Sequence, residues 1–154
     1  MFSQTSEYAI RALSILAQYP TDQYVLVGTL ATKADLPHHY LSKILQNLVR
    51  MQILESRKGS KGGFRLARPA DRITLYDVVN AIENLGTTRR CLLGQAECSD
   101  ERACPLHEFW VRISNDYLET LQRTSLGDLV RFGHRMPPMP AMPDPSSPAR
   151  SDAP

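Results

Sequence analysis

The sequence predicts a mainly α-helical fold that carries one small β-hairpin, and three observations support this fold class. Apolar residues in several segments recur at intervals of three and four, which is the spacing of amphipathic helices. A single glycine-rich segment, residues 59–63, separates two short runs with β-propensity and indicates a hairpin. A long helical pattern follows this compact part, so the 154 residues suffice for one domain with a helical extension.

Three helices are expected in the first fifty residues. Residues 5–19 form the first, which Pro20 ends, and residues 29–34 form the second. Pro37 fits the first turn of the third helix, where its missing N–H removes no hydrogen bond. That helix has an apolar stripe of Leu41, Ile44, Leu45 and Leu48. Its other face consists of His39, Ser42, Lys43, Gln46 and Arg50. Such a face suits a DNA major groove, although a solvated surface is its more common use.

The expected hairpin follows, with strands at residues 54–58 and 64–68 around the glycine-rich turn. Arg57, Lys58, Lys61 and Arg65 crowd its tip and flanks. A helix, a turn, a polar-faced helix and a basic hairpin form the order of a winged helix-turn-helix. In that arrangement the helix reads base edges, while the wing contacts phosphates or the minor groove. The glycine-rich turn lacks P-loop spacing and opens no helix, which argues against a nucleotide site.

Three further segments complete the expected helices. Thr74 is the predicted N-cap of a fourth helix, with Asp77 three residues later, and Gly86 is its expected end. A long helix spans residues 105–123, and Ser125 caps a short terminal helix that ends near Phe132. The long helix has an apolar stripe of Leu106, Phe109, Trp110, Ile113, Tyr117 and Leu121. This stripe can pack on its own domain or pair with a second chain, and its length favours a dimer.

Charge is distributed unevenly along the chain. Residues 23–68 hold eight Lys and Arg against two acidic residues, a net charge of +6. Residues 69–134 hold seven Arg against ten acidic residues, a net charge of −3. This division favours a polyanion-binding module joined to a different module. We find no signal peptide and no membrane span, so we expect a cytoplasmic protein without a membrane partner.

No group of residues assembles a nucleophile, a base and an oxyanion site, so the sequence is not expected to encode an enzyme. The last twenty residues contain seven prolines and cannot form a core. The expected organisation is therefore a DNA-binding domain at residues 1–85, a cysteine-rich loop at 86–105, a dimerisation helix with a short terminal helix at 106–133, and a disordered tail at 134–154.

All three cysteines lie in the pattern Cys91-x6-Cys98-x5-Cys104-x2-His107. The intervening residues are mostly polar, so these thiols are expected to be ligands or redox groups rather than packing residues. Three interpretations stay open: an iron–sulfur cluster, a thiol-redox or zinc switch, and cysteines without a sensing role.

Several motifs in a fixed order carry a resemblance to a known family. They are EYAIRAL at residues 7–13, YLxKILxxL at 40–48, SRKGxxGGFxLA at 56–67, ITLxDVV at 73–79 and the three-cysteine loop. With them, the chain resembles the Rrf-two family of winged-helix bacterial transcription regulators. The resemblance covers residues 1 to about 133 and implies a dimer in which the long helices pair.

The resemblance also implies a metal site. In sensor members of the family three loop cysteines ligate an iron–sulfur cluster, and the matching residues here are Cys91, Cys98 and Cys104. The fourth ligand would be Glu7 from the other subunit or His107, with Asp100 as an outside candidate. The first cysteine gap is six residues here rather than the five of the best-known cluster-binding members, which leaves the cluster type, 2Fe–2S or 4Fe–4S, open.

The resemblance places DNA contacts on the third helix and the wing. The expected contact residues are His38, His39, Tyr40, Ser42, Lys43, Arg57, Lys58 and Lys61. His39 and Ser42 differ from the base-reading residues of the iron–sulfur regulators, so this chain is not expected to share the operator sequence of those regulators. Lys58 stands where those regulators have a wing arginine.

The resulting hypothesis is a homodimeric repressor of a palindromic operator, controlled by a cluster that responds to nitric oxide, oxygen or iron–sulfur supply. The alternatives are a thiol-redox or zinc-dependent regulator and an iron–sulfur carrier or electron-transfer protein.

Overall fold

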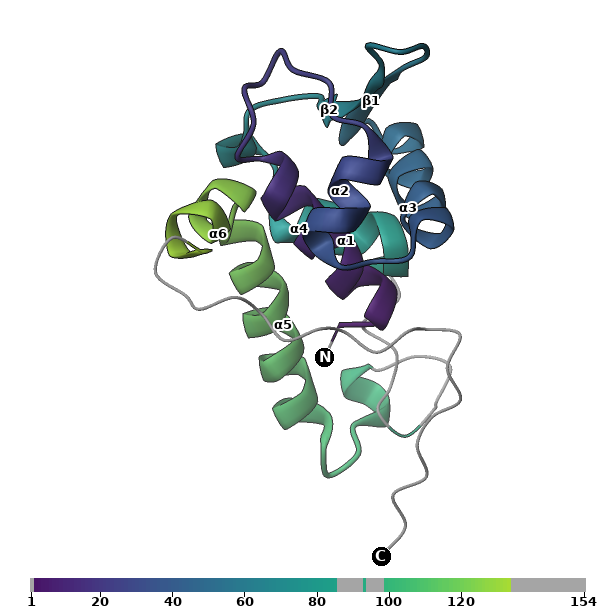
Figure 1. Ribbon diagram of the computed structural model, residues 1–154. Coiled ribbons are helices and arrows are strands. Elements are labelled where there is room, and N and C mark those ends of the chain that lie inside the picture. Colours follow the sequence, from purple (N-terminus) through teal and green to yellow (C-terminus); the bar gives the residue numbers. More distant parts are fainter. Residues whose placement is uncertain (1, 86–92, 94–98, 134–154) are drawn as a thin grey trace, which may run out of the picture.

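The structure is a computed structural model that describes residues 2–85, 93 and 99–133 (Figure 1). Its elements are α1 (Gln4–Leu16), α2 (Val27–Ala34), α3 (His38–Arg50), β1 (Leu54–Arg57), β2 (Gly63–Leu66), η1 (Ala70–Arg72), α4 (Leu75–Glu83), η3 (Asp100–Arg102), α5 (His107–Arg123) and α6 (Leu126–Gly133). The mainly helical fold with one antiparallel hairpin confirms the fold class expected from the sequence.

Helix α1 is the centre of the core. It packs against α2, α3, α4 and α6, so its apolar side chains are covered on more than one face. Tyr8, Leu13, Leu30, Leu41 and Leu45 are fully buried around it. Each buried leucine contributes roughly 1.5–3 kcal/mol relative to an exposed one.

The turn between α2 and α3 fixes the angle between these two helices. Asp35 ends α2 with a left-handed backbone (φ 53°), and the buried Leu36 anchors the turn in the core. Pro37 is the N-cap of α3, one position before the helix begins. Helix α2 begins two residues earlier than the expected Thr29. The turn thereby holds the polar face of α3 outward.

The hairpin is joined to the segment that precedes α2. Strands β1 and β2 pair antiparallel, with Glu55 opposite Arg65. Val25 forms an isolated bridge with Phe64, and the two backbone hydrogen bonds of this bridge are both 2.9 Å long. Gly63 has φ 125°, and a Cβ there would collide with the Val25 carbonyl. Only glycine therefore allows this close approach.

Three helix ends differ from the sequence expectation. Helix α1 ends at Leu16 rather than residue 19, because Gln18 and Tyr19 bond to carbonyls three residues back and form a turn. Helix α4 ends at Glu83, because Asn84 has a left-handed backbone (φ 53°), so the expected extension to Gly86 was wrong. The long helix begins at His107 rather than residue 105.

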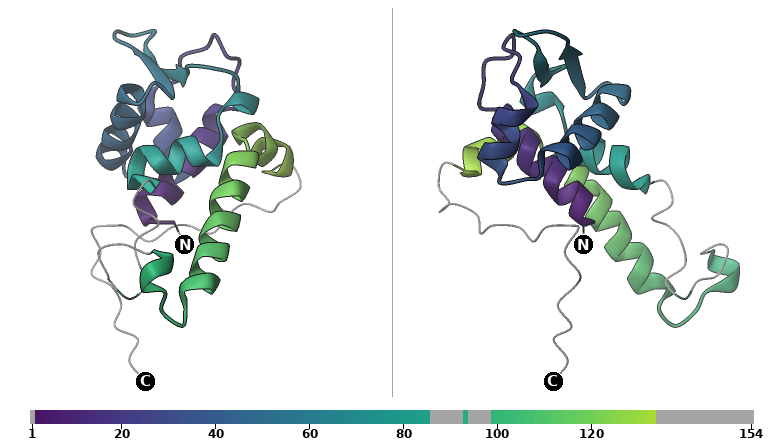
Figure 2. Two further views of the ribbon diagram at one scale, coloured as in Figure 1. Left: turned by 180° about the vertical axis from the view of Figure 1, so that it is seen from behind. Right: turned by 45° about the vertical axis from the view of Figure 1, so that its right-hand side comes forward.

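Helix α5 extends away from the body of the winged helix, and only its C-terminal half lies against the other helices (Figures 1 and 2). The side chains of the apolar stripe differ in exposure between the two ends of the helix. Leu121 is 3% exposed and belongs to the core, whereas Phe109 and Ile113 are 49% and 42% exposed. The C-terminal end of the stripe therefore packs on its own domain, whereas pairing of the exposed N-terminal end with a second chain stays a prediction.

Candidate DNA-binding face and cysteine loop

Helix α3 presents a polar face to solvent. His38, His39, Lys43 and Arg50 are exposed on it, and Ser42 is half-buried. This face exists because the buried stripe of α3, which includes Leu41 and Leu48, lies on the opposite side of the helix. The exposed side chains offer hydrogen-bond donors and positive charge, which are the groups that contact base edges and phosphates.

Tyr40 is placed differently from its neighbours. Its ring is half-buried and lies edge-on against Tyr8, with 5.7 Å between the ring centroids. Its hydroxyl lies 2.6 Å from the Thr5 hydroxyl. Tyr40 therefore links the first turn of α3 to α1, through both its ring and its hydroxyl.

The hairpin projects from the side of the molecule on which α3 lies, in all three views (Figures 1 and 2). Arg57, Lys58 and Lys61 are exposed at or near its tip. Gly59 has φ 101°, a conformation that glycine adopts readily and that reverses the chain. The hairpin and the polar face of α3 thus lie on the same side of the molecule and both carry exposed cations, and the two together are called the cationic surface below.

Arg65 stands apart from these three cations because its charge is paired. Its guanidinium donates two hydrogen bonds, of 2.6 and 2.9 Å, to one carboxylate oxygen of Glu55 on the opposite strand. The bond to Glu55 raises the pKa of Arg65. Tyr24 and Glu55, which shape this surface, were missed at the sequence level. The pairing of Glu55 with Arg65 was accessible from the hairpin register, since opposite charges commonly face each other across strands.

Of the three cysteines, only Cys104 lies in the described residues. Its thiol is free and half-buried, and its backbone carbonyl accepts a 2.9 Å hydrogen bond from the His107 N–H. Cys91 and Cys98 lie outside the described residues. The position of Cys104 is thus tied to the first turn of α5.

His107 is 7% exposed, and its Nε2 atom lies 2.9 Å from a carboxylate oxygen of Asp100. The pair lies beside a cavity of about 340 Å³ between η3 and α5. The cavity is lined by Ser99, Asp100, His107, Trp110, Val111, Ser114 and Asn115. The Asp100 contact fixes the ring orientation of His107.

Glu7 lies in the first turn of α1 and is exposed. In the part of the chain that the structure describes, no three Cys, His, Asp or Glu side chains lie close enough together to hold a metal ion. A single subunit thus does not bring Glu7, Cys104 and His107 into one site. Among the same residues, no helix is long and apolar enough to cross a membrane.

A family model described as "Iron-dependent Transcriptional regulator" (Rrf2) matches residues 2–131. The chain belongs to the Rrf2 family. It is 30% identical over 134 residues to an HTH-type transcriptional regulator of Aquifex aeolicus, a match that covers 86% of this chain and 92% of the relative. It is 32% identical over 130 residues to protein aau3 of Rhizobium meliloti, with 84% of each chain covered. The assignment makes the chain a transcriptional regulator with a DNA-binding helix-turn-helix, as expected from the sequence.

Solved structures with the same fold include other regulators. The B. subtilis protein CymR, described as the global cysteine regulator, has a TM-score of 0.72 at 24% identity, with 86% of this chain and 97% of that chain covered. IscR of T. potens has a TM-score of 0.71 at 20% identity, with 90% and 93% covered. At these identities the similarity shows that the Rrf2 chain shares their fold.

Proposed function

We propose that this Rrf2-family regulator acts as a homodimeric repressor at a palindromic operator and that an iron–sulfur cluster controls its affinity for DNA. The observation that carries the DNA-binding part is the cationic surface formed by the exposed face of α3 and the hairpin. Helix α3 would enter the major groove through His38, His39, Ser42 and Lys43. Phosphate and minor-groove contacts would come from Arg57, Lys58 and Lys61.

Dimerisation through α5 is supported by the apolar residues that its N-terminal half exposes. Leu106, which is the N-cap of α5, and Phe109 and Ile113 within the helix are spaced three and four residues apart and are 40%, 49% and 42% exposed. An apolar stripe of this kind on a projecting helix is typical of a protein–protein interface. A second copy of α5 would cover it and would place two α3 helices on one face of DNA. A palindromic operator suits this two-fold arrangement, with half-sites about one helical turn apart.

The sensing part of the proposal assigns Cys91, Cys98 and Cys104 as cluster ligands. The free, half-buried thiol of Cys104 fits this role, because thiolates are the usual protein ligands of iron–sulfur clusters. A bound cluster would supply iron that reacts with oxidants or nitric oxide. The chain's own contribution is the hydrogen bond between His107 and Cys104, which links ligation at Cys104 to the start of α5. Residues 86–105 would then form a sensor loop between the DNA-binding domain and the dimer helix.

For the fourth ligand the proposal favours Glu7 of the other subunit over His107. Glu7 is exposed and can be reached from outside its own subunit, whereas His107 is buried and its Nε2 already contacts Asp100. Ligation by His107 through Nε2 would require that contact to break. A Glu7→Gln variant that retains full cluster stability would instead favour His107.

The test uses full-length protein purified without oxygen. The purified protein should be brown, should absorb visible light and should contain iron and sulfide. It should also select a palindromic duplex from a random pool. DNA affinity should change when the cluster is removed. Cys98→Ala should leave folding and dimerisation intact but abolish that response. Colourless protein that binds its duplex with an oxidant-independent affinity would overturn the sensing part, and failure to bind any duplex would overturn the whole proposal.

A zinc or thiol switch is the second candidate, because three cysteines and one histidine also form a common zinc ligand set. Metal analysis separates the two candidates. Stoichiometric zinc without visible absorption would favour this candidate over the cluster.

A further inference from the structure

We propose that Tyr24 positions the guanidinium of Arg57 for the DNA minor groove, so that binding depends on the base pairs that flank those read by α3. This inference rests on the proposed function, since it requires the hairpin to lie against DNA. It assigns Arg57 as the wing's sequence-sensitive contact and Tyr24 as a positioning residue.

The backbone at Tyr24 is held firmly beside the hairpin. The next residue, Val25, forms a bridge with Phe64 in β2 through two backbone hydrogen bonds of 2.9 Å. Val25 itself is buried. The half-buried ring of Tyr24 is therefore a fixed surface against which hairpin side chains can pack.

The Arg57 guanidinium has two restraints. Its central carbon lies 4.7 Å from the centroid of the Tyr24 ring, within the range of a cation–π contact. One of its terminal nitrogens donates a 2.6 Å hydrogen bond to the Lys61 carbonyl across the turn. An arginine held in this way loses less conformational freedom when it binds than one that moves freely.

Arg65 shares the same ring but is not equivalent. Its guanidinium lies 4.8 Å from the Tyr24 centroid, yet Glu55 neutralises its charge through a 2.6 Å ion pair. The Tyr24 hydroxyl also contacts Glu55, at 3.5 Å. In contrast, none of the ion pairs among the described residues involves Arg57. Of the two arginines on this ring, Arg57 is therefore the one whose charge is available to DNA.

The chemistry of the guanidinium points to the minor groove. A narrow minor groove in A·T-rich DNA has an enhanced negative potential that attracts arginine. Arginine is more weakly hydrated than lysine, so it enters such a groove more readily than the neighbouring Lys58 would. The expected preference is for A·T pairs on both sides of the sequence that α3 reads.

The experiment measures the affinity of the full-length protein for the duplex recovered by selection, in three forms. The flanks carry A·T, G·C or inosine·C pairs, the last of which lack the guanine amino group in the minor groove. Wild-type protein should bind the A·T and inosine·C forms about tenfold more tightly than the G·C form. Arg57→Lys and Tyr24→Leu should reduce this ratio to about two or less, while Tyr24→Phe, which keeps the ring, should preserve it.

A double variant tests whether Tyr24 acts through Arg57. Tyr24→Leu combined with Arg57→Lys should reduce the ratio no further than either change alone. Tyr19→Leu is the matched control, because Tyr19 also lies under a cation, with Lys33 Nζ at 4.8 Å, but this cation belongs to α2 and not to the hairpin. This control should keep the full ratio.

Several results would overturn the proposal. It fails if wild-type protein binds all three duplexes equally. It also fails if Arg57→Lys keeps the preference for A·T flanks, and this second test can be read even if Tyr24→Leu does not fold. An undiminished ratio in folded Tyr24→Leu would remove Tyr24 from the mechanism. If wild-type protein binds no selected duplex, the proposed function fails as well. If it binds a selected duplex without a preference for its flanks, only the inference about Tyr24 and Arg57 fails.

Discussion

Thr74 and Ser125 face each other across an antiparallel β-bridge, and each of them caps a helix. The Leu75 N–H donates to the Thr124 carbonyl and the Leu126 N–H donates to the Ile73 carbonyl, both at 2.8 Å. One junction thus holds the starts of α4 and α6 together. Since α5 ends directly before this junction, the bridge also attaches the projecting helix to the DNA-binding domain.

Both caps have the same design, with an aspartate three residues after the capping hydroxyl. Thr74 Oγ1 accepts a 3.1 Å bond from the Asp77 N–H, and Asp77 accepts a 3.0 Å bond from the Thr74 N–H. Thr74→Ala should lower the free energy of unfolding by about 1 kcal/mol, because it leaves a helix N–H without its partner. Thr74→Ser, which retains the hydroxyl, should lose much less in urea unfolding. Equal losses for both variants would contradict the capping role.

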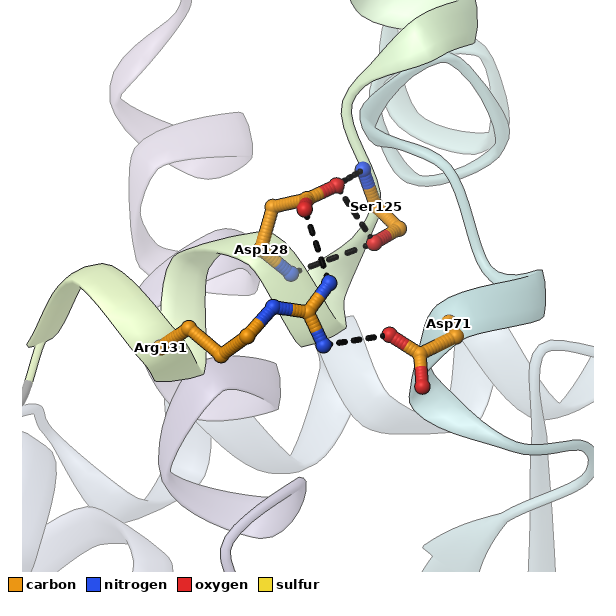
Figure 3. Close-up of polar contacts among 4 residues, drawn as sticks. All are labelled: Asp71, Ser125, Asp128 and Arg131. Carbon is orange, nitrogen blue, oxygen red and sulfur yellow. Dashed lines mark hydrogen bonds and ion pairs between the residues drawn. The ribbon is translucent and has the colours of Figure 1, made fainter.

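Asp128 makes α6 sensitive to acid. Hydrogen bonds from the Ser125 hydroxyl and backbone, with support from Arg131, hold the pKa of Asp128 well below its ordinary value (Figure 3). Because the folded-state pKa is lowered, the stabilisation is complete above the unfolded-state pKa of about 3.9 and is lost as the pH falls below it. Asp128→Asn should therefore lower the Tm at pH 7, and its difference from wild type should narrow as the pH falls below about 3.9.

The control for this pH dependence is Asp116→Asn, which removes an exposed carboxylate from α5. Thermal melts of the three proteins between about pH 3 and 7 provide the comparison. A Tm difference between Asp128→Asn and wild type that stays constant over this range would contradict the assignment.

Lys61 is expected to contact a phosphate rather than a base. Its side chain is exposed at the hairpin, and only its backbone carbonyl takes part in the bond with Arg57. Lys61→Gln should weaken binding to all duplexes alike and lower the slope of log K against log salt by about one. Arg123→Gln, which removes an exposed cation from α5, should leave this slope unchanged. A loss confined to one base pair would contradict a phosphate contact.

Local signals explain most of what could be predicted about the fold. Pro37 marked the start of α3, Thr74 and Asp77 marked the start of α4, and the glycine-rich turn marked the hairpin. The helix ends were less accessible. A left-handed Asn84 ends α4 before Gly86, and such a conformation depends on packing as much as on residue type. The bridges at Val25 and Thr74 join segments distant in sequence, which no local pattern encodes.

The cationic surface was predicted from charge and spacing, but its internal organisation was not. Whether an arginine is paired depends on the tertiary environment, and Glu55 neutralises Arg65 whereas no carboxylate pairs with Arg57 among the described residues. Tyr40 was likewise expected to contact DNA, and its hydroxyl instead lies 2.6 Å from the Thr5 hydroxyl within the domain. The ligand roles of Cys91 and Cys98 stay predictions, because both residues lie outside the described part of the chain.

The exposed stripe of α5 predicts how the dimer can be broken. Phe109 is 49% exposed and lies one helical turn before Ile113 in the proposed interface. Phe109→Glu places a charge there, and burying that charge in an apolar interface is unfavourable. The variant should be monomeric in sedimentation equilibrium and should bind a palindromic duplex at least about tenfold more weakly, because each subunit then engages its half-site alone. Gln122→Glu, which adds the same charge at an exposed position nearer the end of α5, should remain dimeric. A dimer that survives Phe109→Glu with its DNA affinity unchanged would place the subunit interface elsewhere.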